Sequence, residues 1–135
     1  LIHYLVKAAG RNANLLMNIG PQPDGCLPEV AIERLKKVGE WMNIYGETIY
    51  GTRGGIIQPH DWGVTTQKQN RLFVHILNLK DKALYLPTGN TRIKKAVDFV
   101  SRKQVRMQKC DGGVVLYLDQ VPTDVDKVVE LEMAK

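Results

Sequence analysis

Two acidic residues near the start of the chain, Asp24 and Glu29, lie close enough in sequence to be considered as an acid and base pair. General acid and base catalysis uses carboxyl groups whose environments differ. Asp24, however, precedes Gly25 in a turn sequence, and Glu29 falls in the expected first turn of a helix, where a negative charge is stabilised by the helix dipole. We therefore interpret both as structural and predict no catalytic residue within this chain.

Residues that could bind a metal ion are scattered. His3 falls in an expected helix, His60 in a loop and His75 in a strand, and neither Cys26 nor Cys110 has a partner at metal-ligand spacing. We expect no metal site, and we expect His75 to be a partly buried strand residue. A serine, histidine and acid order, a phosphate-binding loop and a dinucleotide-binding motif are also missing from the sequence, so no cofactor is predicted.

The first part of the chain, residues 1–52, has a pattern of helix, strand and helix. Residues 1–9 place apolar side chains on one helical face, and Gly10 is expected to end this helix in the left-handed conformation. Residues 12–19 contain an apolar run typical of a strand that is buried on both faces, as in a parallel sheet. A turn rich in proline and glycine follows, and residues 28–44 predict an amphipathic helix.

The second part, residues 53–135, contains short alternating strands separated by glycine, proline, asparagine and aspartate. The expected strands are 62–67, 71–77, 83–86, 93–100, 105–110, 114–118 and 128–133. Such a series predicts an antiparallel β-sandwich. The composition changes near residue 52, so we predict two domains that meet there.

A single buried parallel strand needs partner strands on both sides, because its N–H and C=O groups must be hydrogen-bonded. No such partners occur in residues 1–52. The order of helix, strand and helix is the repeating unit of an α/β barrel. We therefore expect residues 1–52 to be the last helix, strand and helix of a (β/α)8-type barrel, and the chain to be a C-terminal fragment.

Several blocks of residues strengthen this interpretation, because they occur in a fixed order. They read NLLMNIGP at 14–21, DG at 24–25, VGEW at 38–41 and GETIYGTR at 46–53. Together they resemble the end of the catalytic barrel in the α-L-fucosidases of glycoside hydrolase family 29. The resemblance covers about residues 10 to 53, and residues 54–56, which read GGI, depart from the family pattern. Beyond Arg53 only the strand pattern fits.

The resemblance implies a part of an enzyme that hydrolyses terminal α-L-fucosyl residues of glycans by a retaining mechanism. Such a mechanism uses a nucleophilic carboxylate and an acid/base carboxyl group about 5 Å apart. In the family both lie upstream of the matched segment, so this chain alone is expected to be inactive. By barrel geometry, Asn18 would face the sugar pocket, either bonding a substrate hydroxyl or supporting neighbouring loop backbone. The partners implied are the fucosylated glycan and the upstream barrel of the same polypeptide, and the compartment implied is periplasmic, extracellular or lysosomal.

Other function classes are open to the β-sandwich. It could be a carbohydrate-binding module if its aromatic side chains gather on one exposed face or loop end, the candidates being Trp62, Tyr85, Phe99 and Tyr117. It could equally be a structural domain that covers one side of the barrel, which we prefer. The chain carries a net charge of +5, with cations concentrated between Arg92 and Lys109, but only Phe99 there could stack on a base, so we expect no nucleic-acid partner. No run reaches the roughly 18 apolar residues that span a membrane, so no membrane partner is expected.

Overall fold

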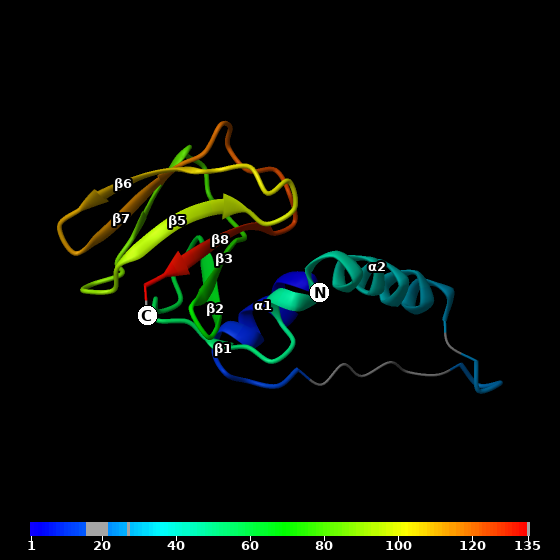
Figure 1. The fold of residues 1–135 in the computed structure, drawn as a ribbon. Coiled ribbons are helices and arrows are strands. Elements are labelled where there is room, and N and C mark those ends of the chain that lie inside the picture. The colour runs from blue at the N-terminus through cyan, green and yellow to red at the C-terminus, as the bar shows by residue number, and fades with distance from the viewer. Residues whose placement is uncertain (16–21, 27, 135) are drawn as a thin grey trace.

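The structure is a computed structural model and describes residues 1–15, 22–26 and 28–134. Two helices, α1 (Ile2–Gly10) and α2 (Glu29–Tyr45), come first, and a short 3-10 helix, η1 (Gly46–Thr48), leads into the strands (Figure 1). The strands are β1 (Arg53–Gly54), β2 (Gly63–Lys68), β3 (Arg71–Ile76), β4 (Ala83–Leu86), β5 (Ile93–Asp98), β6 (Arg106–Cys110), β7 (Gly113–Tyr117) and β8 (Lys127–Met133). The mixed fold class predicted from the sequence, helices followed by antiparallel sheets, is confirmed.

The strands form two antiparallel sheets. The larger has the order β1-β2-β3-β8-β5 and the smaller has the order β4-β7-β6. Each of the seven strands expected from the sequence is present within two residues of its predicted bounds. The two-residue strand β1 was not predicted, because so short a segment carries no periodic signal; it pairs with the end of β2.

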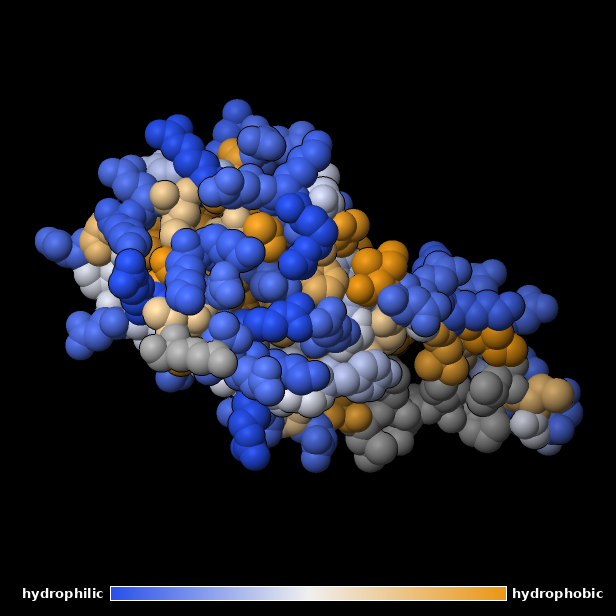
Figure 2. All heavy atoms as spheres, viewed as in Figure 1, coloured by the Kyte–Doolittle hydropathy of each residue, from blue (hydrophilic) through white to orange (hydrophobic). Residues whose placement is uncertain are grey.

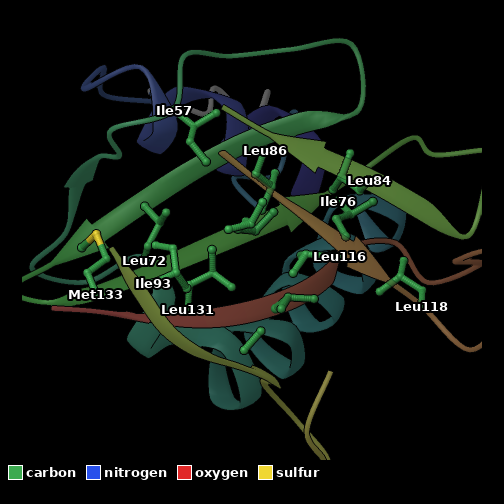
Figure 3. Close-up of a cluster of buried hydrophobic side chains, with 14 residues drawn as sticks. Ile57, Leu72, Ile76, Leu84, Leu86, Ile93, Leu116, Leu118, Leu131 and Met133 are labelled. Atoms are coloured by element: carbon green, nitrogen blue, oxygen red, sulfur yellow. The ribbon is translucent and has the colours of Figure 1, made fainter. Parts of the chain in front are cut away.

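The main core lies between the two sheets. Alternate residues of β3, Leu72, Val74 and Ile76, point into it and pack against inward residues of β4, β7 and β8 (Figure 3). Leu84 and Leu116 are paired across the small sheet, and Leu72 and Leu131 are paired across the large one. This alternation is what places one face of each strand in a common apolar layer.

The other face of the large sheet is covered by the helical segment, so β3 is buried on both faces. Phe73 and His75 point to that side and are both completely buried. His75 was expected to be only partly buried. That expectation was wrong, because an alternating strand was assumed to have one solvent-exposed face and β3 has none. The run of five buried residues, Leu72 to Ile76, is instead typical of a central strand between two layers.

Helix α1 ends differently from the prediction. Gly10 is the last helical residue, and the left-handed conformation falls on Asn12, whose φ is 58°. Gly10 is required for packing: a Cβ atom there would lie 2.5 Å from the Cβ of Val64 in β2. The glycine therefore lets α1 touch the sheet backbone closely.

Helix α2 has the predicted extent but is only partly covered. Trp41 is its only buried residue, whereas Val30, Ile32 and Ile44 are exposed. In Figure 1 the helix projects away from the sandwich, and Figure 2 shows apolar residues along one side of it and hydrophilic residues along the other. The amphipathic pattern is thus present, but most of its apolar side has no cover among the described residues.

The strand expected at residues 12–19 is not seen in its described part. Asn12 belongs to a turn, and residues 13–15 are irregular. The remainder of that prediction, residues 16–19, lies outside the described residues. The division into domains at residue 52 remains a prediction, although α1 and the 46–54 segment pack directly on β2.

Candidate functional site

The most highly organised polar region of the chain is the junction between the helical segment and the outer face of the large sheet. Its apolar part is a row of aromatic rings that begins on α2. Trp41 stacks on Tyr45 with 5.1 Å between ring centroids, and Tyr45 stacks on Phe99 at 5.7 Å. Phe99 in turn meets Phe73 edge to face at 5.9 Å. This row joins the end of α2 to β3 and to the turn after β5.

Carboxylates surround the phenol of Tyr45. Burial raises the pKa of this phenol, and the negative charges of three aspartates, Asp124, Asp126 and Asp98, raise it further. Tyr45 therefore stays neutral at physiological pH and serves as a packed ring rather than as an acid.

A chain of buried hydrogen bonds lies beside the aromatic row. The hydroxyl of Thr66 donates to the carbonyl oxygen of Thr48 over 2.6 Å, and the hydroxyl oxygen of Thr66 is 2.9 Å from His75 Nε2. On the other side of the ring, His75 Nδ1 is 2.6 Å from Asp126 Oδ2. All four residues are at most 1% exposed, so each of these bonds is shielded from water.

An ion network lies on the same side of the sheet. Arg71 binds both Glu47, which follows α2, and Glu130 of β8, and Arg102 also reaches Glu130, at 3.2 Å. Burial alone would raise the pKa of Glu130, but the hydrogen bonds from Arg71 and Arg102 outweigh it and hold that pKa below its ordinary value. The hydrogen bonds that Arg71 donates to Glu130 and Glu47 raise the pKa of Arg71. Glu130 and Arg71 are therefore both charged at neutral pH.

These contacts assign a structural task to most of the block at 46–53. Glu47 binds Arg71, and Thr48 accepts from Thr66 through its carbonyl while its own hydroxyl donates to the carbonyl of Tyr45. The Thr52 hydroxyl donates to the carbonyl of Ile49 over 2.7 Å, and Arg53 opens β1. The block thus closes α2 and attaches it to the sandwich.

The segment after α1 is attached to the same place. The side-chain oxygen of Asn12 accepts a hydrogen bond from the backbone N–H of Gly54 over 2.7 Å. A Cβ atom on Gly54 would lie 2.5 Å from the carbonyl oxygen of Gly10, so this close crossing of two backbones requires glycine. A cavity of about 540 Å³ opens beside the crossing, lined by α1, by residues 12–15 and by residues 49–53.

Of the three candidate residues in the first part of the chain, the structure describes Asp24 and Glu29. Asn18, the single predicted substrate-binding residue, lies outside the described residues. Asp24 accepts a hydrogen bond from the backbone N–H of Cys26 over 3.0 Å, as a turn residue does, and Glu29 is exposed in the first turn of α2. Both structural interpretations agree with these positions.

The histidines and cysteines have separate surroundings. His3 Nε2 is 2.5 Å from the carbonyl oxygen of Val125, and His60 stacks on Trp62. His75 belongs to the buried chain of hydrogen bonds. Cys26 and Cys110 are exposed and unpaired with each other. Within residues 1–15, 22–26 and 28–134, no three histidine, cysteine, aspartate or glutamate side chains gather as metal ligands would.

No pattern in the sequence indicates directly that His75 pairs with Asp126, because the two residues are far apart in the chain. The hint that could have been used is the uninterrupted apolar run around His75, because a histidine buried on both sides must find a polar partner.

Comparison with known proteins places this fold. A sequence model of the family described as Alpha-L-fucosidase matches residues 1–47. The plasma α-L-fucosidase of Rattus norvegicus is 36% identical over 85 residues, which are 59% of this chain and 18% of that protein. The tissue α-L-fucosidase of the same species is 33% identical over 137 residues, which are 90% of this chain and 28% of that protein.

Solved structures extend the likeness through the sandwich. The α-L-fucosidase isoenzyme 1 of Paenibacillus thiaminolyticus superposes with a TM-score of 0.87 at 30% identity, covering 99% of this chain and 34% of that one. A family 29 α-L-fucosidase of Bacteroides thetaiotaomicron has the same fold, with a TM-score of 0.89 at 21% identity over 98% of this chain.

The fold is therefore that of the helix and β-sandwich portion of a glycoside hydrolase. More narrowly, the chain is a relative of the α-L-fucosidases of glycoside hydrolase family 29. It spans about one third of the length of the Paenibacillus enzyme, and 18% and 28% of the two rat relatives. Neither helix in the described part of the chain has the length and apolar character that crossing a membrane requires.

Proposed function

We propose that this chain is the C-terminal part of an α-L-fucosidase that removes terminal α-L-fucosyl residues from glycans with retention of configuration. The observation that supports this most directly is the likeness to the Paenibacillus enzyme, which extends over 99% of this chain but only 34% of that one. The two catalytic carboxyl groups would be supplied by the upstream part of the barrel, so the chain by itself would be inactive.

The surface of the helical segment supports an upstream partner. Leu1, Tyr4 and Tyr50 are more than half exposed, as are Val30 and Ile44 of α2. Exposed apolar side chains at this density along two helices mark a surface that another element covers. The rest of an α/β barrel is the occupant that fits, because the outer helices of such a barrel pack through one apolar side.

The junction described above gives the sandwich its role in this proposal. The sandwich would hold the end of α2 through Arg71, Thr66 and the aromatic row. The turn after α1 would be held through the bond between Asn12 and Gly54, and both attachments would fix the last elements of the barrel. Asn18, at the end of the strand predicted from the sequence, would lie near the sugar pocket as a supporting residue. The plasma relative supports an extracellular compartment for the parent protein.

Release of nitrophenol from 4-nitrophenyl α-L-fucoside tests the proposal. The parent polypeptide that contains this chain should turn the substrate over, and the 135-residue chain should not. Adding the 4-nitrophenyl β-D-galactoside and β-D-glucoside as controls shows whether the activity is specific for fucose. Turnover by neither protein contradicts the proposed enzyme, and turnover by this chain alone contradicts the assignment of the catalytic carboxyl groups to the upstream part.

A further inference from the structure

The positive charge of the chain is concentrated in one segment. Residues 92–110 contain seven of the 19 lysines and arginines but only one of the 14 aspartates and glutamates, Asp98. Seven cations and one carboxylate give this segment a net charge of +6, whereas the whole chain has a net charge of +5. The rest of the chain is therefore slightly negative, and the positive field of the molecule comes from this segment.

The fold brings the segment to one edge of the sandwich. It forms β5, the last strand of the large sheet, and β6, the last strand of the small sheet. The two strands meet at a bridge between Val97 and Gln104, and the backbone N–H of Val105 donates to the carbonyl oxygen of Ala96 over 2.9 Å. The cations of both strands therefore share one edge, and the start of β5 and the end of β6 lie on the same side of the molecule (Figure 1).

A β-bulge in β5 turns two consecutive lysines outward. Ile93 and Lys95 pair with consecutive residues of β8, so β5 holds one extra residue, Lys94. Ile93 and Ala96 both belong to the main core, a spacing of three that the period of two of a regular strand does not allow. Lys94 and Lys95 are in turn both exposed. The bulge thus gives solvent two charges that a regular strand would place on opposite faces.

Most of these cations have no carboxylate to neutralise them. Asp98 pairs with a lysine of β8 outside the segment, Arg102 binds Glu130, and Lys95 lies 3.9 Å from Glu132. The other five cations are exposed and, in the part of the chain that the structure describes, take part in no ion pair: Arg92, Lys94, Lys103, Arg106 and Lys109.

The two ends of the edge differ in their surroundings. Asp119 and Asp124 line the same hollow as Lys103 and Arg106, so carboxylates offset the cations at that end. Arg92, Lys94 and Lys109 lie toward the other end, at the start of β5 and the end of β6. An anion would therefore be attracted most strongly to this second end.

The composition of the segment favours a flexible polyanion held by point charges. A single-stranded nucleic acid needs rings on which its bases stack, and the one aromatic side chain of the segment, Phe99, is buried in the aromatic row. An anionic membrane surface needs apolar side chains beside the cations, and within residues 92–110, all of which the structure describes, Val100 is the single large one exposed. Sulfate groups need neither, because they accept charge-assisted hydrogen bonds from lysine and arginine.

We propose that the edge formed by β5 and β6 binds a sulfated polysaccharide, with sulfate groups on Arg92, Lys94 and Lys109. This binding uses no residue that holds α2 and involves no hydrolysis. It goes beyond the proposed enzyme activity and can fail or succeed independently of it.

The test is fluorescence anisotropy of a labelled heparin octasaccharide that is titrated with the 135-residue chain. Binding should saturate, and it should weaken by about tenfold or more between about 50 mM and about 200 mM NaCl, because bound cations release counterions from the polyanion. Neutral dextran should not displace the probe. Displacement by single-stranded oligothymidylate or by phosphatidylserine vesicles, as efficient as by unlabelled heparin, would overturn the assignment to a sulfated polysaccharide.

Two triple variants separate the edge from the net charge, because each replaces one arginine and two lysines at exposed positions. The edge variant is Arg92→Gln, Lys94→Gln and Lys109→Gln, and the α2 variant is Arg34→Gln, Lys36→Gln and Lys37→Gln. The edge variant should weaken heparin binding by about tenfold or more, and the α2 variant by less than about twofold. Asp111→Asn, which removes the carboxylate in the turn after β6, should strengthen binding.

Two outcomes would overturn the proposal outright. No saturable binding, or equal losses in the two triple variants, would leave the edge lysines only the role of preventing pairing with a second sheet. Amide chemical shifts of the unsubstituted chain give an answer that needs no variant. Heparin should move the amides of Lys94, Lys95 and Lys109, and shifts confined to α2 would contradict the site.

Discussion

His75 Nδ1 lies 2.6 Å from Asp126 Oδ2, with both side chains completely buried. The rest of the hydrogen-bond chain fixes where the protons are. Because a carbonyl oxygen can only accept, the Thr66 hydroxyl must donate to Thr48, and its oxygen must then accept from His75 Nε2–H. The contact between Nδ1 and Oδ2 therefore holds one further proton, shared within a pair of zero net charge.

This arrangement predicts an order for substitutions of Asp126. In Asp126→Asn the side-chain amide can donate to Nδ1 of a neutral imidazole, so the bonds from His75 Nε2 to Thr66 and from Thr66 to Thr48 keep their direction. In Asp126→Ala the ring loses its partner in a buried place, which typically costs about 3–5 kcal/mol. Urea unfolding should show a clearly smaller loss of stability for Asn than for Ala. Equal losses would mean that Asp126 does not act through the imidazole.

Thr66→Val tests the other end of this chain of hydrogen bonds. The change keeps the shape of the side chain but removes its hydroxyl, so the Thr48 carbonyl and the His75 Nε2–H lose their shared partner. Leaving a buried polar group unpaired costs about 1–3 kcal/mol. The unfolding free energy should fall by that amount, whereas Thr123→Val, an exposed change, should have little effect. If the two variants were equally stable, water would have to replace the hydroxyl.

Acid should destabilise the junction through Glu130 and Asp98. The folded-state pKa of each is lowered, so each contributes stability that is present above its ordinary pKa, 4.5 for Glu130 and 3.8 for Asp98, and is lost as the pH falls through the folded value. Urea midpoints should therefore decrease as the pH falls below about 4.5.

Glu130→Gln provides the matched measurement. It removes one of the two titrating groups, so the variant should be less stable at neutral pH but should lose less further stability on acidification. Glu33→Gln, an exposed change on α2, should leave the pH dependence as it was. A Glu130 variant with the full acid dependence would assign the effect to other carboxylates.

The contrast between the two parts of the chain shows what could be predicted from the sequence. The bounds of the strands were predicted to within two residues, because alternation along β3 and β7 reflects one continuous core between two sheets. Local signals also gave α2 and the turn at Asp24. The junction could not be predicted, because Arg71, His75 and Asp126 meet there from distant positions and each is an unremarkable residue in its own strand or loop. The end of α1 was wrong because Gly10 has a packing role that resembles a helix stop signal.

The difference between a glycine that is needed for packing and one that is not can be measured at Gly10 and Gly39. Gly39 lies in the interior of α2, is exposed, and has open space where a Cβ would be, so Gly39→Ala should stabilise the chain by about 0.5–1 kcal/mol through helix propensity. Gly10 is also helical, but a Cβ there would lie 2.5 Å from Val64 Cβ, a rigid atom next to the β2 backbone. Gly10→Ala should instead cost about 1–3 kcal/mol by overpacking. Thermal or urea unfolding of both variants checks the opposite signs. A stabilising effect of alanine at both positions would show that α1 can move away from β2, and that Gly10 serves the helix end rather than the contact with the sheet.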